Sequence, residues 1–194
     1  MSDIQSEEEY QKSQVQALPI TLLGDPVLRQ HTKAVKDISA PEIQVLIDDM
    51  LATVQAAHGA GLAAPQVGVS LSIFIVCPDA GRQRYPHASI QDTLVVINPK
   101  LEKVGNKRVT DWEACLSIPG IRGKVPRFER IRITYQNRLG EHCVEEYDGF
   151  TARVFQHEYD HLQGQVFFDR MNSLKSLMMD EEFVRQMEAG IEDI

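Results

Sequence analysis

The stretch His157-Glu158-Tyr159-Asp160-His161 constrains this chain more than any other part of its sequence. On an α-helix, residues i and i+4 lie one above the other on the same face, so His157 and His161 can bind one divalent metal ion. The carboxylate of Glu158 can then take a proton from water bound to that ion. The motif therefore predicts a helix that carries a catalytic metal. The alternative is a helix that carries two unrelated histidines.

Length and charge narrow the class of protein. The chain has 194 residues, enough for one domain with a substantial core. Its formal charge of −8 argues against a DNA-binding surface, which needs cationic patches. Met1–Gln16 has neither the apolar core of a secretory signal nor the character of a transit peptide, and no apolar run approaches the ~20 residues of a membrane span. We expect a cytoplasmic protein that binds neither DNA nor membranes.

The hydrophobic pattern predicts an α+β fold. Residues 1–17 read as a flexible acidic extension, and residues 18–194 as a single catalytic domain. A helix is expected from Pro41 to just before Gly59, and another should carry the metal motif and end at Gly164. Short runs rich in apolar and β-branched residues, separated by turn residues, predict a largely antiparallel sheet. Its strands are expected at 73–76, 94–97, 131–135 and 144–147.

A last helix is expected over about residues 173–189. Its apolar residues fall on one stripe that should pack against the body of the protein: Leu174, Leu177, Met178, Val184 and Met187.

Two histidines leave a catalytic metal short of one protein ligand, because such sites usually have three ligands and one open position. His142 is one candidate, although a solvated turn histidine is the simpler interpretation. Glu181 lies twenty residues beyond His161, about where some peptidases take a carboxylate ligand. Cys115 is the third candidate, as a thiolate. The residues alone leave the choice open.

Three separated motifs give the chain a specific resemblance. They are G-x-G-x-A-A-x-Q at Gly59–Gln66, a variant of E-G-C-L-S at Glu113–Ser117, and H-E-x-D-H at His157–His161. In this order they make the chain similar to bacterial-type peptide deformylases over roughly residues 18–175. Ala114 departs from the family pattern, which has Gly there. A positive φ at that position would strain Ala by about 1 kcal/mol.

The resemblance implies an enzyme whose sheets surround a central metal-binding helix. It implies that Cys115, His157 and His161 bind one divalent ion and that Glu158 is the general base. The side-chain amide of Gln66 and the backbone N–H of Leu116 would hold the developing oxyanion. The implied ion is Fe²⁺, with Zn²⁺, Ni²⁺ or Co²⁺ as alternatives in purified protein. By ligand softness alone, one Cys and two His suit Zn²⁺ equally well.

The implied reaction is hydrolysis of the N-formyl group from the N-terminal methionine of new polypeptides, which releases formate. N-formylmethionyl nascent peptides would be the partners, with transient ribosome contact. The acidic C-terminal segment argues against a tight ribosome anchor.

Several further residues have two interpretations each. Gly59, Ala60 and Gly61 either pair with substrate backbone or form a plain helix-to-strand turn. Phe150 and Val154 either wall the methionine pocket or pack in the core.

The charged residues near the motifs also have more than one possible role. Arg122 either contacts substrate or is solvated. Glu113 and Arg127 are expected to pair and steady the cysteine loop, as the resemblance suggests. Asp160 either orients one histidine or caps a contact that faces the helix.

Two other functions fit parts of the pattern. A metallopeptidase would use His157, His161 and Glu181 as ligands. A binding protein for formyl peptides or nascent chains would hold a structural metal, which usually needs four protein ligands.

Overall fold

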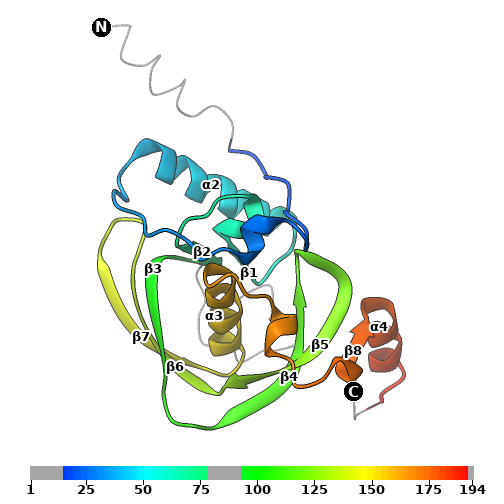
Figure 1. Cartoon of the computed structure of the whole chain (residues 1–194). Coiled ribbons are helices and arrows are strands. Elements are labelled where there is room, and N and C mark those ends of the chain that lie inside the picture. The colour runs from blue at the N-terminus through cyan, green and yellow to red at the C-terminus, as the bar shows by residue number, and fades with distance from the viewer. Residues whose placement is uncertain (1–14, 78–92, 192–194) are drawn as a thin grey trace, which may run out of the picture.

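The structure, a computed structural model, describes residues 15–77 and 93–191. The predicted acidic extension lies almost entirely outside these residues. A five-stranded sheet has the order β1-β2-β3-β6-β7, and a three-stranded sheet has the order β4-β5-β8. Each pair of neighbouring strands is antiparallel. With the helices packed against these sheets, the predicted α+β class is confirmed (Figure 1).

The elements have the following bounds. The first sheet contains β1 (Gly61–Ala63), β2 (Ile73–Val76), β3 (Leu94–Lys103), β6 (Arg130–Gln136) and β7 (His142–Asp148). The second contains β4 (Arg108–Cys115), β5 (Ile118–Phe128) and β8 (Leu177–Met179). The helices of the described residues are α2 (Pro41–Ala56), α3 (Gly149–Leu162) and α4 (Asp180–Glu188), with short 3₁₀ helices η1 (Pro26–Arg29), η2 (Ala64–Val67), η4 (Phe167–Arg170) and η5 (Leu174–Ser176).

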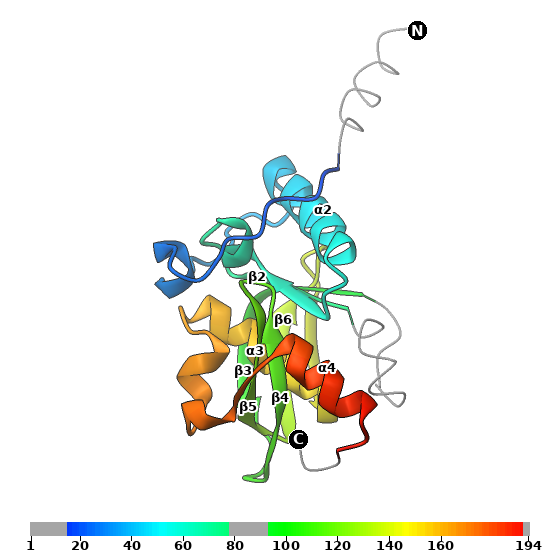
Figure 2. The ribbon, with the colours of Figure 1, turned by 90° about the vertical axis from the view of Figure 1, so that its right-hand side faces the viewer.

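Helix α3 lies in the middle of the molecule, surrounded by strands of both sheets (Figures 1 and 2). Eleven of its 14 residues are buried, including polar and charged ones. Phe155 anchors its apolar side: its ring stacks on Tyr147 at 4.6 Å between centroids and meets Phe74 edge-on at 5.7 Å. A helix enclosed on all sides must find partners for its polar groups inside the protein, because buried polar groups without hydrogen bonds are costly.

Helix α2 forms as its sequence pattern predicts. Pro41 occupies the first turn, where the missing N–H costs nothing. Ile47, Met50 and Val54 are fully or almost fully buried against β1 and β2. Within the described residues, no helix is both long and apolar enough to cross a membrane.

The predicted C-terminal helix over 173–189 is wrong in its first part. Residues 174–176 form η5, residues 177–179 form β8, and only Asp180–Glu188 is α-helical. Strand β8 pairs with Ile121–Gly123 of β5, so a strand edge with unpaired backbone groups outweighs the local preference for helix.

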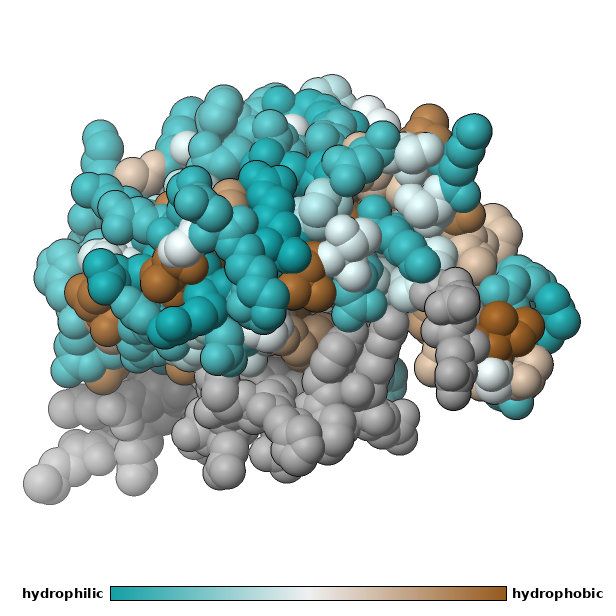
Figure 3. Space-filling view, turned by 90° about the horizontal axis from the view of Figure 1, so that it is seen from below, coloured by the Kyte–Doolittle hydropathy of each residue, from teal (hydrophilic) through white to brown (hydrophobic). Residues whose placement is uncertain are grey.

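The packed stripe predicted for this helix is wrong at Leu174, Val184 and Met187, whereas Leu177 is partly buried and packs against the buried residues around Phe167. Val184 and Met187 are exposed, and Leu174 is 67% exposed, whereas Phe183 is buried. Seen from below, hydrophobic side chains are visible at the end of the molecule that carries α4 (Figure 3).

Gly164→Ala should destabilise the fold more than Gly105→Ala. Both glycines have a left-handed backbone, with φ of 70° and 79°, so each variant carries strain of about 1 kcal/mol. An added Cβ at Gly164 would lie 2.7 Å from the carbonyl carbon of Arg29, whereas nothing lies within 4 Å of one at Gly105. The clash should add about 1–3 kcal/mol. Urea unfolding measures both, and equal losses would contradict this account.

Candidate active site

The three residues that the sequence singled out as metal ligands come together. The ligand atoms of Cys115, His157 and His161 all lie within 4.8 Å of one another. Cys115 ends β4, and the two histidines lie one turn apart on α3. The Cys115 Sγ is 3.3 Å from the His161 Nε2. All three residues are buried, at 6%, 8% and 0% exposure.

His157 is oriented by a carboxylate. Its Nδ1 lies 2.9 Å from Glu113 Oε2, so Nδ1–H donates to Glu113 and Nε2 is left to face Cys115 and His161. Such a second contact fixes the tautomer of a metal-binding histidine. One thiolate and two imidazoles make a donor set that suits a divalent transition-metal ion. The residues present therefore fit a metal.

Glu113 is the centre of a buried ionic network. Arg127 donates from Nε and Nη2 to its two oxygens at 2.8 and 2.9 Å, which is the predicted pair. Arg153 donates to Glu113 Oε1 at 2.8 Å. Burial raises the pKa of Glu113, but the guanidinium of Arg127 outweighs burial and holds this pKa well below its usual range. Glu113 is therefore a fixed negative charge beside the candidate metal ligands.

One interpretation of the sequence was that Asp160 orients a histidine. In the structure it does not. Its carboxylate accepts from Arg127 Nη1 at 2.5 Å and from Arg170 Nη2 at 2.6 Å. Because Arg127 already lies between Asp160 and Glu113, Asp160 supports the histidines only through that arginine.

The two imidazoles differ in their affinity for a proton. Burial lowers the pKa of His157, but its contacts with Cys115 and Glu113 outweigh burial and raise the pKa well above its usual value. Burial, reinforced by the neighbouring His157, lowers the pKa of His161 well below its usual value. The ring centroids are only 5.1 Å apart, so a proton on one ring disfavours a proton on the other.

Glu158 is buried with one unsatisfied oxygen. Its Oε2 makes no hydrogen bond within the described residues, and burial raises its pKa to about 7. Its other oxygen lies so close to Gly61 that a Cβ there would be 2.4 Å away. The second glycine of the first motif is thus required for Glu158 to reach the site. A carboxyl group with a pKa near 7 can both accept and donate a proton at neutral pH.

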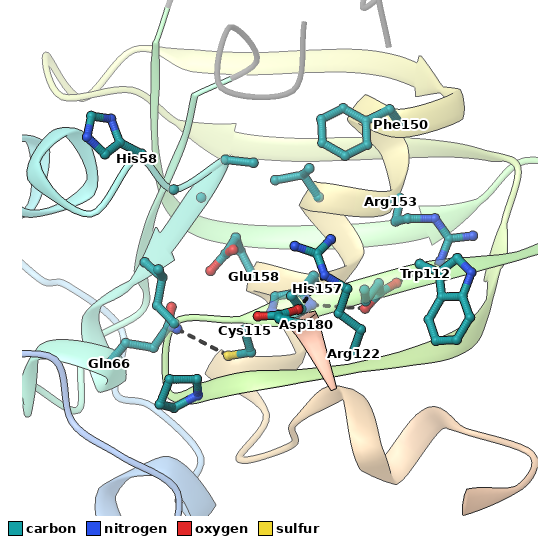
Figure 4. Close-up of a pocket in the computed structure, with 18 of the residues that line it drawn as sticks. His58, Gln66, Trp112, Cys115, Arg122, Phe150, Arg153, His157, Glu158 and Asp180 are labelled. Carbon is teal, nitrogen blue, oxygen red and sulfur yellow. Dashed lines mark hydrogen bonds and ion pairs between the residues drawn. The ribbon is translucent and has the colours of Figure 1, made fainter. Parts of the chain in front are cut away.

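Gln66 is held with its amide nitrogen toward the cysteine. Its Oε1 accepts from the backbone N–H of Ala63 at 2.8 Å, and its Nε2 lies 3.5 Å from Cys115 Sγ and 3.3 Å from Ser117 Oγ. Figure 4 shows Gln66 beside Cys115 on one side of the pocket. The bound oxygen fixes which end of the amide faces the site.

These groups lie in a cavity of about 490 Å³. Every residue that the sequence proposed for catalysis or substrate binding lines it, together with two of the three ligands; the lining includes Gly59, Ala60, Gly61, Gln66, Cys115, Leu116, Arg122, Phe150, Val154, His157 and Glu158. His161 lies behind this lining and has no exposed surface.

Ala114 also lines the cavity, and it is not strained. Among the described non-glycine residues, only His58 and Asn98 have a positive φ. The strain that a positive φ would cause at Ala114 is therefore absent.

Arg153 and Asp180 are among the residues of this cavity that were missed at the level of sequence. Arg153 holds the backbone carbonyls of Val109 and Val125 at 2.6 and 2.8 Å, in addition to Glu113. It thereby ties α3 to β4 and β5. A single arginine on a helix carries no sequence signal for such a role.

The other candidate ligands lie elsewhere. His142 is exposed at the start of β7, and Glu181 is exposed in the first turn of α4. Within residues 15–77 and 93–191, neither belongs to the group of potential metal ligands.

The sequence model of the polypeptide deformylase family matches residues 17–177. The chain belongs to the polypeptide deformylase family. Peptide deformylase 2 of Nostoc sp. is 45% identical over 166 residues, which are 86% of this chain and 92% of that protein. Peptide deformylase 1 of Nitrosomonas europaea is 43% identical and covers 81% of this chain and 89% of its own length.

Solved deformylase structures agree in fold. The crystal structure of peptide deformylase from Thermotoga maritima matches with a TM-score of 0.73 at 36% identity, covering 81% of this chain and 99% of that one. A peptide deformylase from Acinetobacter baumannii with bound Met-Ala-Ser matches with a TM-score of 0.75 at 33% identity, covering 81% and 100%. Membership in the deformylase family thus rests on both sequence and fold.

Cys115→Ala should lose bound metal, whereas Glu181→Ala should keep it. The first change removes the only sulfur donor of the cluster, and the second removes an exposed carboxylate outside it. Elemental analysis of both purified variants against wild type measures the metal per chain. If E181A lost the metal and C115A kept it, the ligand set of the peptidase alternative would replace the one proposed here.

Proposed function

We propose that this chain hydrolyses the N-formyl group from the N-terminal methionine of newly made polypeptides and releases formate. One observation carries the proposal: Cys115, His157 and His161 converge, and the first two line the same cavity as Glu158, whose carboxylate has an unsatisfied oxygen. Three protein ligands with a carboxylate next to them are typical of a hydrolytic metal site rather than a structural one, which usually has four protein ligands.

The peptide would bind in an extended conformation between the two sheets. β1 is the edge strand of one sheet and β4 is the edge strand of the other, and residues of both line the cavity. Free backbone groups of these two edges would pair with the peptide as an added strand, a common way to bind peptides. Phe150 and Val154 would form apolar walls for the methionine side chain.

A divalent ion held by Cys115, His157 and His161 would polarise the formyl carbonyl and make water more acidic. Glu158 would accept a proton from the attacking water and deliver it to the leaving amine. The Gln66 amide N–H and the Leu116 backbone N–H would donate to the oxygen as negative charge develops on it. Loss of one such donor typically costs about 2.7–4 kcal/mol in activation free energy.

The setting follows from this chemistry. Formylated nascent chains leave the ribosome, so we propose transient contact with translating ribosomes and a cytoplasmic location. The metallopeptidase alternative is less favoured because Glu181 lies outside the cluster of potential ligands. The binding-protein alternative is less favoured because, among the residues that the structure describes, the cluster has three members rather than four.

Glu158→Gln should keep the metal and lose turnover. The amide has the shape of the carboxylate but cannot accept the proton, so kcat for formyl-Met-Ala-Ser should fall at least about a hundredfold. Formate release measures turnover, and elemental analysis measures metal content. Full activity in E158Q would refute the assigned general base, and no formate from metal-loaded wild type would refute the function.

For the metal itself, we propose Fe²⁺ in the cell, with Zn²⁺, Ni²⁺ or Co²⁺ acceptable in purified protein. A ferrous ion beside a thiolate is prone to oxidation, so protein purified without oxygen should lose activity in air. Activity and metal content followed during exposure to air test this. A protein that changes in neither respect does not use iron.

A further inference from the structure

The C-terminal segment forms part of the cavity, although the family match ends at residue 177. β8 pairs with β5 in a register that sets Met178 opposite Arg122. The chain then enters α4, whose first residue, Asp180, lies in the cavity lining together with Arg122. Two residues that are 58 positions apart thus meet at the substrate site.

Arg122 is held on two sides by this segment. Its Nε donates to Asp180 Oδ1, and its guanidinium carbon lies 4.6 Å from the ring centroid of Phe183. Phe183 is itself anchored, with 6% exposure and an edge-on contact with Trp112 at 5.5 Å between centroids. The arginine is therefore fixed by an ion pair and by a cation–π contact.

The terminal nitrogens of Arg122 remain available. Within the described residues, its one hydrogen bond is from Nε to Asp180, so neither Nη group is used. The side chain of Arg122 is 28% exposed. Figure 4 shows Arg122 and Asp180 within the same pocket as Cys115, His157 and Glu158. A guanidinium bound only through Nε presents its other donors in a fixed plane.

We propose that Asp180 is a positioning residue, which holds Arg122 so that its Nη groups bind backbone carbonyl oxygens of the substrate beyond the formylmethionine. This inference rests on the proposed function. A free arginine must lose rotamer freedom each time a peptide binds, whereas one fixed in advance does not. The pair thereby favours peptides that continue past methionine over formylmethionine alone.

The location of this pair distinguishes it from an ordinary surface ion pair, which contributes little to stability. Glu182 and Arg185 form such a pair on the same helix, with side chains 40% and 66% exposed and no place in the cavity lining. Glu182→Gln is therefore a matched control: it removes the same charge from the same turn of α4 without touching the cavity.

Asp180→Asn should raise KM for formyl-Met-Ala-Ser about tenfold, the usual cost of weakening a hydrogen bond from a charged group. Its kcat, and both constants for formylmethionine amide, should stay within twofold of wild type. E182Q should match wild type on both substrates. Asp180→Glu, which keeps the charge, should recover most of the lost affinity. Equal KM changes for the two substrates, or for D180N and E182Q, would overturn the proposal.

A double-variant cycle tests whether Asp180 acts through Arg122. In an Arg122→Ala background, D180N should change KM for formyl-Met-Ala-Ser less than twofold. A full tenfold change there would overturn the positioning role.

Calorimetric titration of metal-loaded protein with the product Met-Ala-Ser separates this inference from the proposed function, because it needs no turnover. Wild type should bind about tenfold more tightly than D180N even if no formate is released. Equal affinities in wild type and D180N would overturn the positioning role, whatever the turnover assay gives.

Discussion

The carboxylate of Glu113 is the contact on which the rest of this structure depends. It accepts from Arg127 on β5, from Arg153 on α3 and from the metal-site residue His157, all at 2.8–2.9 Å. A lone buried charge would be costly, and removing either partner of a buried pair typically costs about 3–5 kcal/mol. Both oxygens of Glu113 have partners, so its charge is compensated. Its contacts join the second sheet to the central helix at a point on β4 only two residues before Cys115.

Burial of α3 determines the environment of its polar side chains. The enclosed helix keeps water away from His161, which has no exposed surface, and sets the pKa of Glu158 near 7. The same burial demands very close packing, as at Gly61, where no side chain larger than hydrogen fits beside Glu158. Structural and catalytic requirements therefore fall on the same residues of the three motifs.

The C-terminal segment shows where local pattern fails. Its apolar residues recur at helical spacing, yet residues 177–179 form a strand because the edge of β5 offers backbone partners. The strands β4 and β5 were not predicted, and in β5 the residues Pro119, Gly120 and Pro126 interrupt the strand pattern. These strands carry Cys115 and Arg122, so the wall of the cavity opposite α3 could not be drawn from local propensity.

The sequence by itself determined the candidate pair of histidine ligands, the carboxylate next to it and the α+β class, because a helix fixes the spacing of His157 and His161 and because strands and helices have different hydrophobic periods. The motifs also named Cys115, through resemblance rather than geometry. Only the tertiary structure decided that Cys115 meets the histidines while Glu181 does not. It alone joined Asp180 to Arg122. Such contacts depend on strand register and on how sheets close over a helix, which no local stretch of residues encodes.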